Sequence, residues 1–255
     1  MIVYSDFYYW PNDDMRKLHI YLPDDYYESS ERYPVMYMFD GHNLFRDSEA
    51  TYGKSWGLES FINTWDKKMI VVGMECSHRG DERLFEYCPY EKRMFGKTIH
   101  GIGEKTFQWI INDVKPFIDN NFRTYGHREA TGIGGSSMGG IMSMYGVLAH
   151  NDVFSKAAVV SSGVFWNLKN YRRSYPNGLN PDTRIYISWG ELEAGKTAFG
   201  GSPEFDTREA RSVYKFEREL QIMGVQTYHY FQWGGKHCEA DWEKQNSIYM
   251  NFLWK

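Results

Sequence analysis

Short runs of apolar residues alternate with longer amphipathic segments along most of the chain. The apolar runs show little alternation between polar and apolar positions, which is typical of strands that are buried on both faces. Most of them are bounded by glycine or by charged residues. This pattern predicts strands at 34–41, 68–75, 129–135, 156–163, 184–190 and 225–233.

Between these strands, apolar residues recur with the three- and four-residue spacing of helices. The spacing predicts helices at 55–65, 104–122, 137–150, 204–224 and 240–255. Within 104–122, Pro116 predicts a kink or a boundary near Lys115, because proline has no backbone N–H. Alternating strands and helices of this kind predict an α/β fold with a mostly parallel central sheet and helices on both faces.

Two segments, 77–101 and 166–183, follow neither periodicity. We expect them to be loop insertions at the carboxyl ends of strands, where open α/β sheets bind ligands. They could instead form a lid or a subunit contact, and the sequence does not distinguish these alternatives. It does not indicate the oligomeric state either. The chain contains no repeat and no linker-like stretch, so a single domain over 1–255 is expected.

Composition narrows the possible partners. The net charge of −4 gives no basic surface for nucleic acid, and no apolar run approaches the roughly 18 residues of a membrane span. The N-terminus lacks a signal-peptide pattern, which favours a cytoplasmic protein. The 3 cysteines lack C-x-x-C spacing and no H-E-x-x-H occurs, so we expect no metal and no cofactor.

Glycines surround two adjacent serines between 132 and 140. A dinucleotide fingerprint fails because Ser137 takes the place of its last glycine, and a phosphate loop fails because no lysine follows Gly139. A G-x-S-x-G nucleophile elbow fits Ser137 but not Ser136, and it lies between a predicted strand and a predicted helix. The alternative is a glycine-rich turn that only packs the helix against the sheet.

A nucleophilic serine needs a base, and in α/β-hydrolases the chain order is serine, acid, histidine. Among the histidines after Ser137, His150 ends the following helix and His229 lies inside a strand. His237 lies in a glycine-bearing loop after the last strand, which makes it the candidate base.

The acid is expected after the strand at 184–190, where Glu191 and Glu193 are nearly equal candidates. Asp206 is expected to begin or cap the next helix. The N–H of Met138 at the helix start can stabilise an oxyanion, and a second donor is expected near Gly41 or His42.

Four segments in order carry a family resemblance: "MYMFDGHNLF", "INDVKPFIDNNFRT" leading to "GIGGSSMGGIMSMY", "ISWGELE" and "WGGKHCEADW". With them the chain resembles the putative esterase family of α/β-hydrolases. This group includes esterase D-like enzymes, feruloyl and acetyl-xylan esterases and enterobactin-type esterases. The resemblance implies metal-free hydrolysis of a small-molecule carboxylic ester by Ser137, His237 and Glu193, with Met138 and Gly41 or His42 in the oxyanion hole.

The resemblance also has departures and open alternatives. Many relatives have Gln at the position of His42. They also have G-T-x-E where this chain has G-E-L-E, so Glu191 is a second candidate for the triad acid beside Glu193. "RLFEYCPY" resembles a substrate-side loop and implies that Arg83 and Glu86 line the pocket. The ester could be a small, carbohydrate, phenolic or siderophore-type compound. Alternatives are a thioesterase or acyltransferase that uses the same triad, or a non-catalytic binding module.

Overall fold

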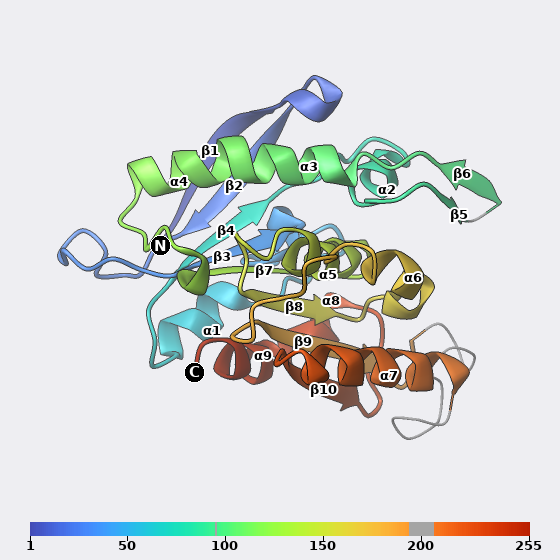
Figure 1. Cartoon of the computed structure of the whole chain (residues 1–255). Coiled ribbons are helices and arrows are strands. Elements are labelled where there is room, and N and C mark those ends of the chain that lie inside the picture. The colour runs from blue at the N-terminus through green and yellow to red at the C-terminus, as the bar shows by residue number, and fades with distance from the viewer. Residues whose placement is uncertain (95, 194–206) are drawn as a thin grey trace. The chain divides into compact units, whose positions relative to one another are not determined.

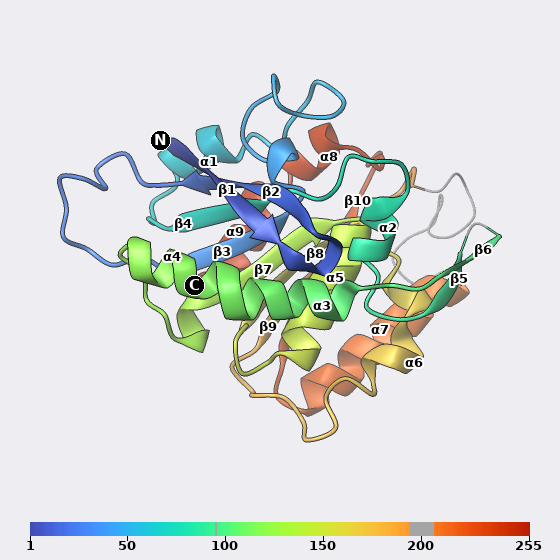
Figure 2. The same cartoon turned by 90° about the horizontal axis from the view of Figure 1, so that it is seen from above.

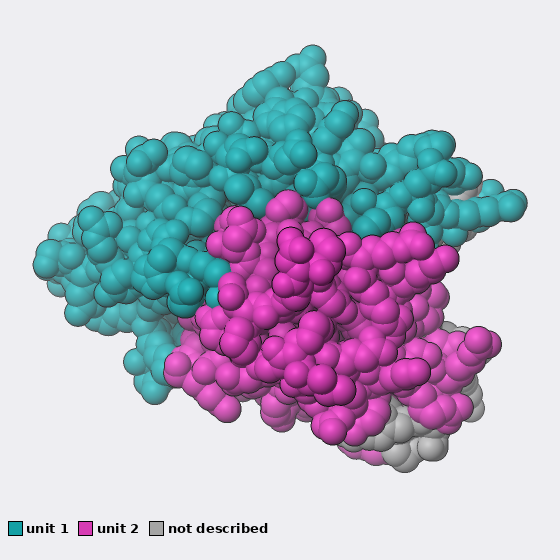
Figure 3. Space-filling model, viewed as in Figure 1, with its two compact units in different colours: residues 1–132 teal, residues 133–255 magenta. Residues whose placement is uncertain are grey.

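Figure 1 shows the computed structural model of the chain, in which residues 1–94, 96–193 and 207–255 are described. The chain divides into two units, residues 1–132 and 133–255, which Figure 3 colours separately. Both units combine strands with helices, and the expectation of one domain stays a prediction.

In the first unit the strands follow the order β1-β2-β4-β3. The apolar runs form β3 (Val35–Phe39) and β4 (Ile70–Met74), which pair in parallel as expected. The sequence pattern missed an N-terminal antiparallel hairpin of β1 (Ile2–Tyr9) and β2 (Asp14–Tyr21), which joins the sheet through β2 and β4. In β1, residues 3–8 alternate between half-buried and exposed, so the strand lacks the continuous apolar run that marks β3 and β4.

Helices cover both faces of this sheet. On one face, the ring of Tyr9 packs at 5.0 Å from that of Trp109 in α3 (Gly103–Trp109). On the other face, the Tyr21 hydroxyl donates at 2.6 Å to the side chain of Asn63 in α1 (Leu58–Thr64).

The long predicted helix at 104–122 runs without a break from α3 through α4 (Lys115–Asn121), as Figures 1 and 2 show. Between the two lies one π-helical turn, Ile110–Val114, and the N–H of Lys115 donates to the carbonyl of Ile110. Pro116 is separated from this turn by Lys115 alone and has no N–H to donate. The wider turn changes the hydrogen-bond pattern just before the proline, so the predicted boundary is a π-bulge.

The segment 77–101 is not an irregular loop, which corrects the expectation. It contains α2 (Glu82–Glu86) and a small antiparallel hairpin of β5 (Lys92–Met94) and β6 (Lys97–Ile99). These elements are too short to produce a hydrophobic period that the sequence pattern can reveal.

In the second unit the order is β7-β8-β9-β10, with β8, β9 and β10 paired in parallel. These strands are β7 (Thr131–Ser136), β8 (Lys156–Val160), β9 (Arg184–Gly190) and β10 (Gln226–Gln232). The helices are α5 (Met138–Ala149), α6 (Leu168–Tyr171), α7 (Arg208–Ile222), α8 (Glu239–Glu243) and α9 (Asn246–Leu253). The predicted insertion at 166–183 thus holds the single-turn helix α6.

Alternate residues of β9 face helices on opposite sides. The Tyr186 hydroxyl bonds at 2.9 Å to the side chain of Gln245, which lies between α8 and α9. Trp189 packs at 4.1 Å from His229, whose ring pairs with Glu217 of α7 at 2.9 Å. Helices therefore cover both faces here as well, and the predicted mostly parallel α/β architecture is confirmed.

Two helix predictions need revision. The closing helix expected at 240–255 is interrupted at Gln245, which turns inward and donates to Gln232 in the buried interior. The helix predicted at 204–224 is α7, which begins after Thr207, and the hydroxyl of Thr207 accepts from the N–H of Ala210. Residues 204–206 of the predicted helix lie outside the described residues. Among the described residues, no helix is long and apolar enough to cross a membrane.

Candidate active site

Ser137 occupies a strained turn between a strand and a helix. β7 ends at Ser136 and α5 begins at Met138, and Ser137 between them has φ 55° and ψ −119°. Its N–H donates to the carbonyl of Val160 at 3.0 Å, and its carbonyl accepts from Ile141 at 3.1 Å. A positive φ is uncommon outside glycine, and such strain concentrates at functional sites.

The two adjacent serines differ in accessibility. Ser136 is buried in β7, whereas Ser137 is half-buried. Close packing around the turn requires Gly140, since a Cβ there would lie 2.6 Å from Cβ of Ser162. Met138 is the first residue of α5, so no carbonyl of the preceding helical turn can accept its N–H. The arrangement exposes one serine beside a helix N-terminus, as the elbow motif predicts.

The structure brings Glu193 and His237 together from loops that follow β9 and β10. Oε2 of Glu193 lies 3.2 Å from Nδ1 of His237. The carboxylate is buried, whereas the imidazole side chain is 43% exposed. The rings of Trp242 and His237 also pack in a T-shaped arrangement, at 5.1 Å between ring centroids. A buried carboxylate that bonds Nδ1 leaves Nε2 of the imidazole for another partner.

Two further donors fix the other oxygen of Glu193. Ser161 donates to Oε1 at 2.6 Å, and the N–H of Gly190 donates to the same atom at 2.7 Å. Ser161 has φ 48°, and its hydroxyl accepts from Nε1 of Trp242 at 2.8 Å. The pattern analysis assigned no role to Ser161, which belongs to no motif, or to Trp242, which ends the segment "WGGKHCEADW", because their contacts join distant parts of the chain.

Glu191 has a different environment. Its carboxylate accepts from the N–H of Gly234 at 2.7 Å, and its own N–H donates to the carbonyl of Gln232. Gly190 allows the loops after β9 and β10 to approach, because a Cβ there would lie 2.5 Å from the carbonyl oxygen of Gly235. Glu191 therefore joins these two loops and leaves the imidazole to Glu193.

The remaining sequence candidates lie elsewhere. His150 is the C-terminal cap of α5, as expected, and His229 pairs with Glu217 from within β10. Asp206 lies outside the described residues.

Gly41 and His42 begin η2 (Gly41–Asn43), a short 3₁₀ turn in the first unit. A Cβ on Gly41 would lie 2.6 Å from the carbonyl carbon of Gly73 in β4, so only glycine fits. His42 is 6% exposed, and its Nε2 lies 3.0 Å from Oγ1 of Thr51. Burial lowers the pKa of His42 to about 4, although the nearby Asp40 opposes this shift. His42 is therefore a neutral imidazole at neutral pH.

Arg83 and Glu86 both take part in ion pairs of the first unit. Arg83 binds both carboxylate oxygens of Asp40, each at 2.7 Å. Burial opposes the ionisation of Asp40, but Arg83 outweighs it and holds the pKa of this carboxyl below its usual value. Glu86 is buried, pairs with Arg16 and accepts from the N–H of Ser77 at 2.9 Å. These contacts give both side chains a structural role, and their place in a substrate pocket stays a prediction.

Comparisons with known proteins identify the family. Residues 12–246 match the family described as Putative esterase. The chain belongs to this family. It is accordingly an esterase, which confirms the family and the ester-hydrolase activity implied by the four motifs.

Individual relatives are distant. The Bacillus subtilis (strain 168) protein YbbA is 25% identical over 182 residues, which cover 70% of this chain and 69% of YbbA. Esterase MT1326 of Mycobacterium tuberculosis (strain CDC 1551 / Oshkosh) is 27% identical over 184 residues, 72% of this chain. The match spans only 34% of that esterase.

Solved structures share the fold. An IroE-like serine hydrolase from Shewanella oneidensis superposes with a TM-score of 0.75 at 18% identity, covering 99% of this chain and 80% of that one. The siderophore hydrolase EstA from Aspergillus nidulans gives 0.71 at 15% identity, with 99% and 94% covered. At these identities the likeness establishes the α/β-hydrolase fold.

Proposed function

We propose that the protein hydrolyses carboxylic esters through an acyl-enzyme, with Ser137 as nucleophile, His237 as general base and Glu193 as the acid that orients it. The observation that carries this proposal is the pairing of buried Glu193 with Nδ1 of His237. It occurs in the same unit as the strained turn at Ser137.

In the first half-reaction, Oγ of Ser137 attacks the ester carbonyl carbon while Nε2 of His237 accepts its proton. Glu193 accepts from Nδ1–H, which fixes the tautomer with the lone pair on Nε2 and stabilises the imidazolium that forms. The N–H of Met138 donates to the developing oxyanion. The bond between the acyl carbon and the alcohol oxygen then breaks, and the alcohol leaves with the proton from His237.

In the second half-reaction, water attacks the acyl-enzyme and gives its proton to His237. The bond to Ser137 then breaks, Ser137 regains its proton and the carboxylic acid leaves. The second oxyanion donor, expected near Gly41 or His42, stays a prediction.

Glu193 is proposed as the acid in preference to Glu191. Glu193 pairs with the imidazole and also accepts from Ser161 and Gly190, whereas Glu191 accepts from the backbone of the loop after β10. A triad acid must hold the imidazole in one orientation. Of the two glutamates, Glu193 is the one that pairs with the imidazole and whose carboxylate is itself held by other hydrogen-bond donors.

Two exposed tryptophans favour a substrate with flat rings or sugar faces. Trp166 follows β8 and is 55% exposed, and Trp233 follows β10 and is 65% exposed. Both lie beyond the carboxyl ends of parallel strands, the edge at which Ser137, Glu193 and His237 also occur. Phenolic, siderophore-type or carbohydrate esters can stack on such rings.

Turnover of p-nitrophenyl acetate by Ser137→Ala tests this proposal, with Ser136→Ala as the matched control. We expect Ser137→Ala to lower kcat by on the order of 10⁴-fold or more, because the nucleophile is lost. Ser136→Ala should retain most of the activity. Near-wild-type turnover by Ser137→Ala would rule out the assignment, and faster turnover of a matched thioester would favour a thioesterase.

A further inference from the structure

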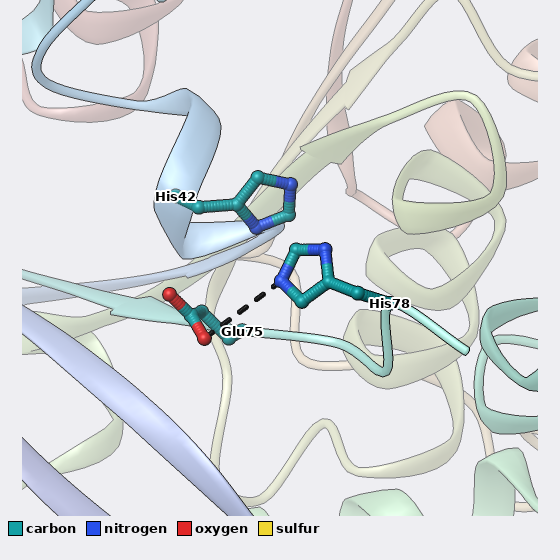
Figure 4. Close-up of side chains that lie close together, drawn as sticks. All are labelled: His42, Glu75 and His78. Carbon is teal, nitrogen blue, oxygen red and sulfur yellow. Dashed lines mark ion pairs between the residues drawn. The ribbon is translucent and has the colours of Figure 1, made fainter. Parts of the chain in front are cut away.

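Three side chains in the first unit converge outside the proposed triad. His42 in η2, Glu75 directly after β4 and His78 in the following segment point toward one another (Figure 4). One potential ligand atom from each lies within 4.8 Å of the other two. The Oε2 atom of Glu75 is 3.8 Å from Nε2 of His78.

The imidazole of His42 has one nitrogen engaged and one available. Nε2 lies 3.0 Å from the Thr51 hydroxyl, which fixes the ring orientation. Nδ1 is buried and has no hydrogen-bond partner among the described residues. A buried polar atom without a partner is costly and calls for an explanation. A bound cation would supply the missing partner.

Glu75 is held by a second layer of side chains. Its Oε1 lies 2.7 Å from Nε2 of His19, and Nδ1 of that buried histidine lies 3.4 Å from Glu49. This chain of contacts orients the carboxylate and leaves Oε2 directed toward His78. Ligands of metal ions are supported by outer hydrogen-bonding partners of this kind, and the Thr51 contact to His42 has the same role.

We propose that His42, Glu75 and His78 bind one divalent transition-metal ion, with zinc as the favoured ion. Two imidazoles and one carboxylate suit zinc, whereas magnesium and calcium prefer sites built from oxygen atoms. With metal–ligand distances of about 2.1 Å, tetrahedral ligand atoms lie about 3.4 Å apart. The ligand atoms now lie within 4.8 Å of one another, so their longest separation must shrink by up to about 1.4 Å. The His78 side chain is 56% exposed and has the freedom to close this distance.

Such an ion would tie η2 to the segment that follows β4. Those segments are already in close contact, since Gly41 leaves no room for a Cβ against Gly73. The site departs from the sequence expectation of no metal. Its ligands form no recognised motif, because His42 is remote in sequence and only Glu75-x-x-His78 is local.

Zinc content and affinity test the proposal on the full, untagged chain. The protein is stripped with a chelator, titrated with ZnCl₂ by calorimetry, and analysed for retained zinc by mass spectrometry after dialysis. The variants are His78→Ala and Glu75→Gln. The matched control is His100→Ala, because His100 forms an exposed pair with Glu91 at 2.9 Å and belongs to no group of three potential ligands among the described residues.

We expect one zinc per chain in the wild type and in His100→Ala, and at least a tenfold lower affinity in the other two variants. Coordination should also shift the ¹⁵N resonance of Nδ1 of His42 on zinc addition. Because His78 is exposed, His78→Ala keeps the test valid even if Glu75→Gln misfolds. Absent zinc binding, or equal affinity in His78→Ala and His100→Ala, would overturn the proposal.

Discussion

Ser161→Ala is the change that most directly tests how Glu193 is supported. Ser161 is buried, and its hydroxyl donates to Glu193 at 2.6 Å while accepting from Trp242 at 2.8 Å. A hydrogen bond to a charged group contributes about 1.5–3 kcal/mol, and the contact to Trp242 contributes about 1 kcal/mol more. We therefore expect the free energy of unfolding to fall by about 2.5–4 kcal/mol.

The neighbouring Ser162 provides a matched control. It is also buried, but its hydroxyl has no hydrogen-bond partner among the described residues. Ser162→Ala removes a buried polar atom that makes no hydrogen bond, so no hydrogen bond is lost. We expect this variant to keep the stability of the wild type within about 0.5 kcal/mol or to be more stable. Each substitution removes one hydroxyl and keeps the Cβ of the original serine. A difference in stability between the two variants therefore reports the hydrogen bonds of Ser161 and not a change in packing.

Urea unfolding followed by tryptophan fluorescence measures the stability of both variants, and p-nitrophenyl acetate kinetics measure their activity. Gly190 still donates to Glu193 in Ser161→Ala, so the carboxylate is loosened and not lost. A loss of about 1.4 kcal/mol in transition-state stabilisation predicts a kcat about tenfold lower, with KM little changed. Equal stability and equal kcat in the two variants would refute this reasoning.

Three other changes follow from the same contacts. Glu193→Gln should lower kcat by about 10²-fold or more while Glu191→Gln retains most of it, and the reverse order in esterase assays would exchange their roles. Gly41→Ala should destabilise the protein by about 1–3 kcal/mol, measured by urea unfolding, because its Cβ would lie 2.6 Å from the backbone of β4. Arg83→Met should cost about 3 kcal/mol by leaving the buried carboxylate of Asp40 unpaired, and adding Asp40→Asn should recover part of that loss. An unchanged midpoint in either stability experiment would contradict the packing or pairing described.

The strands that the sequence revealed are those with continuous apolar runs. β3, β4, β7, β8 and β9 appear where the runs predict them, because almost all of their residues are buried. β10 also appears where predicted, although only its last two residues are buried. The hairpin of β1 and β2 escaped notice because residues 3–8 of β1 are half-buried or exposed and only the last four residues of β2 form a continuous buried run. The π turn before Pro116 depends on hydrogen bonding, and hydrophobic spacing does not register it.

In the candidate site, residues within a local motif could be predicted from the sequence, whereas isolated residues could not. The G-x-S-x-G spacing identifies a strained serine because the constraint lies within five residues. The choice between Glu191 and Glu193 depended on which carboxylate the fold turns toward His237. The supports from Ser161 and Trp242, and the convergence of His42 with Glu75, join segments far apart in sequence. One sequence without its fold contains no signal for such contacts.

The central claim is that Ser137 is the nucleophile, and covalent labelling tests it most directly. The protein would be treated with a fluorophosphonate, digested and analysed by peptide mass spectrometry, with p-nitrophenyl acetate turnover followed in parallel. The account predicts one label per chain on Ser137 with a matching loss of turnover. A folded, active protein that takes up no label, or carries it on another residue, would contradict the account.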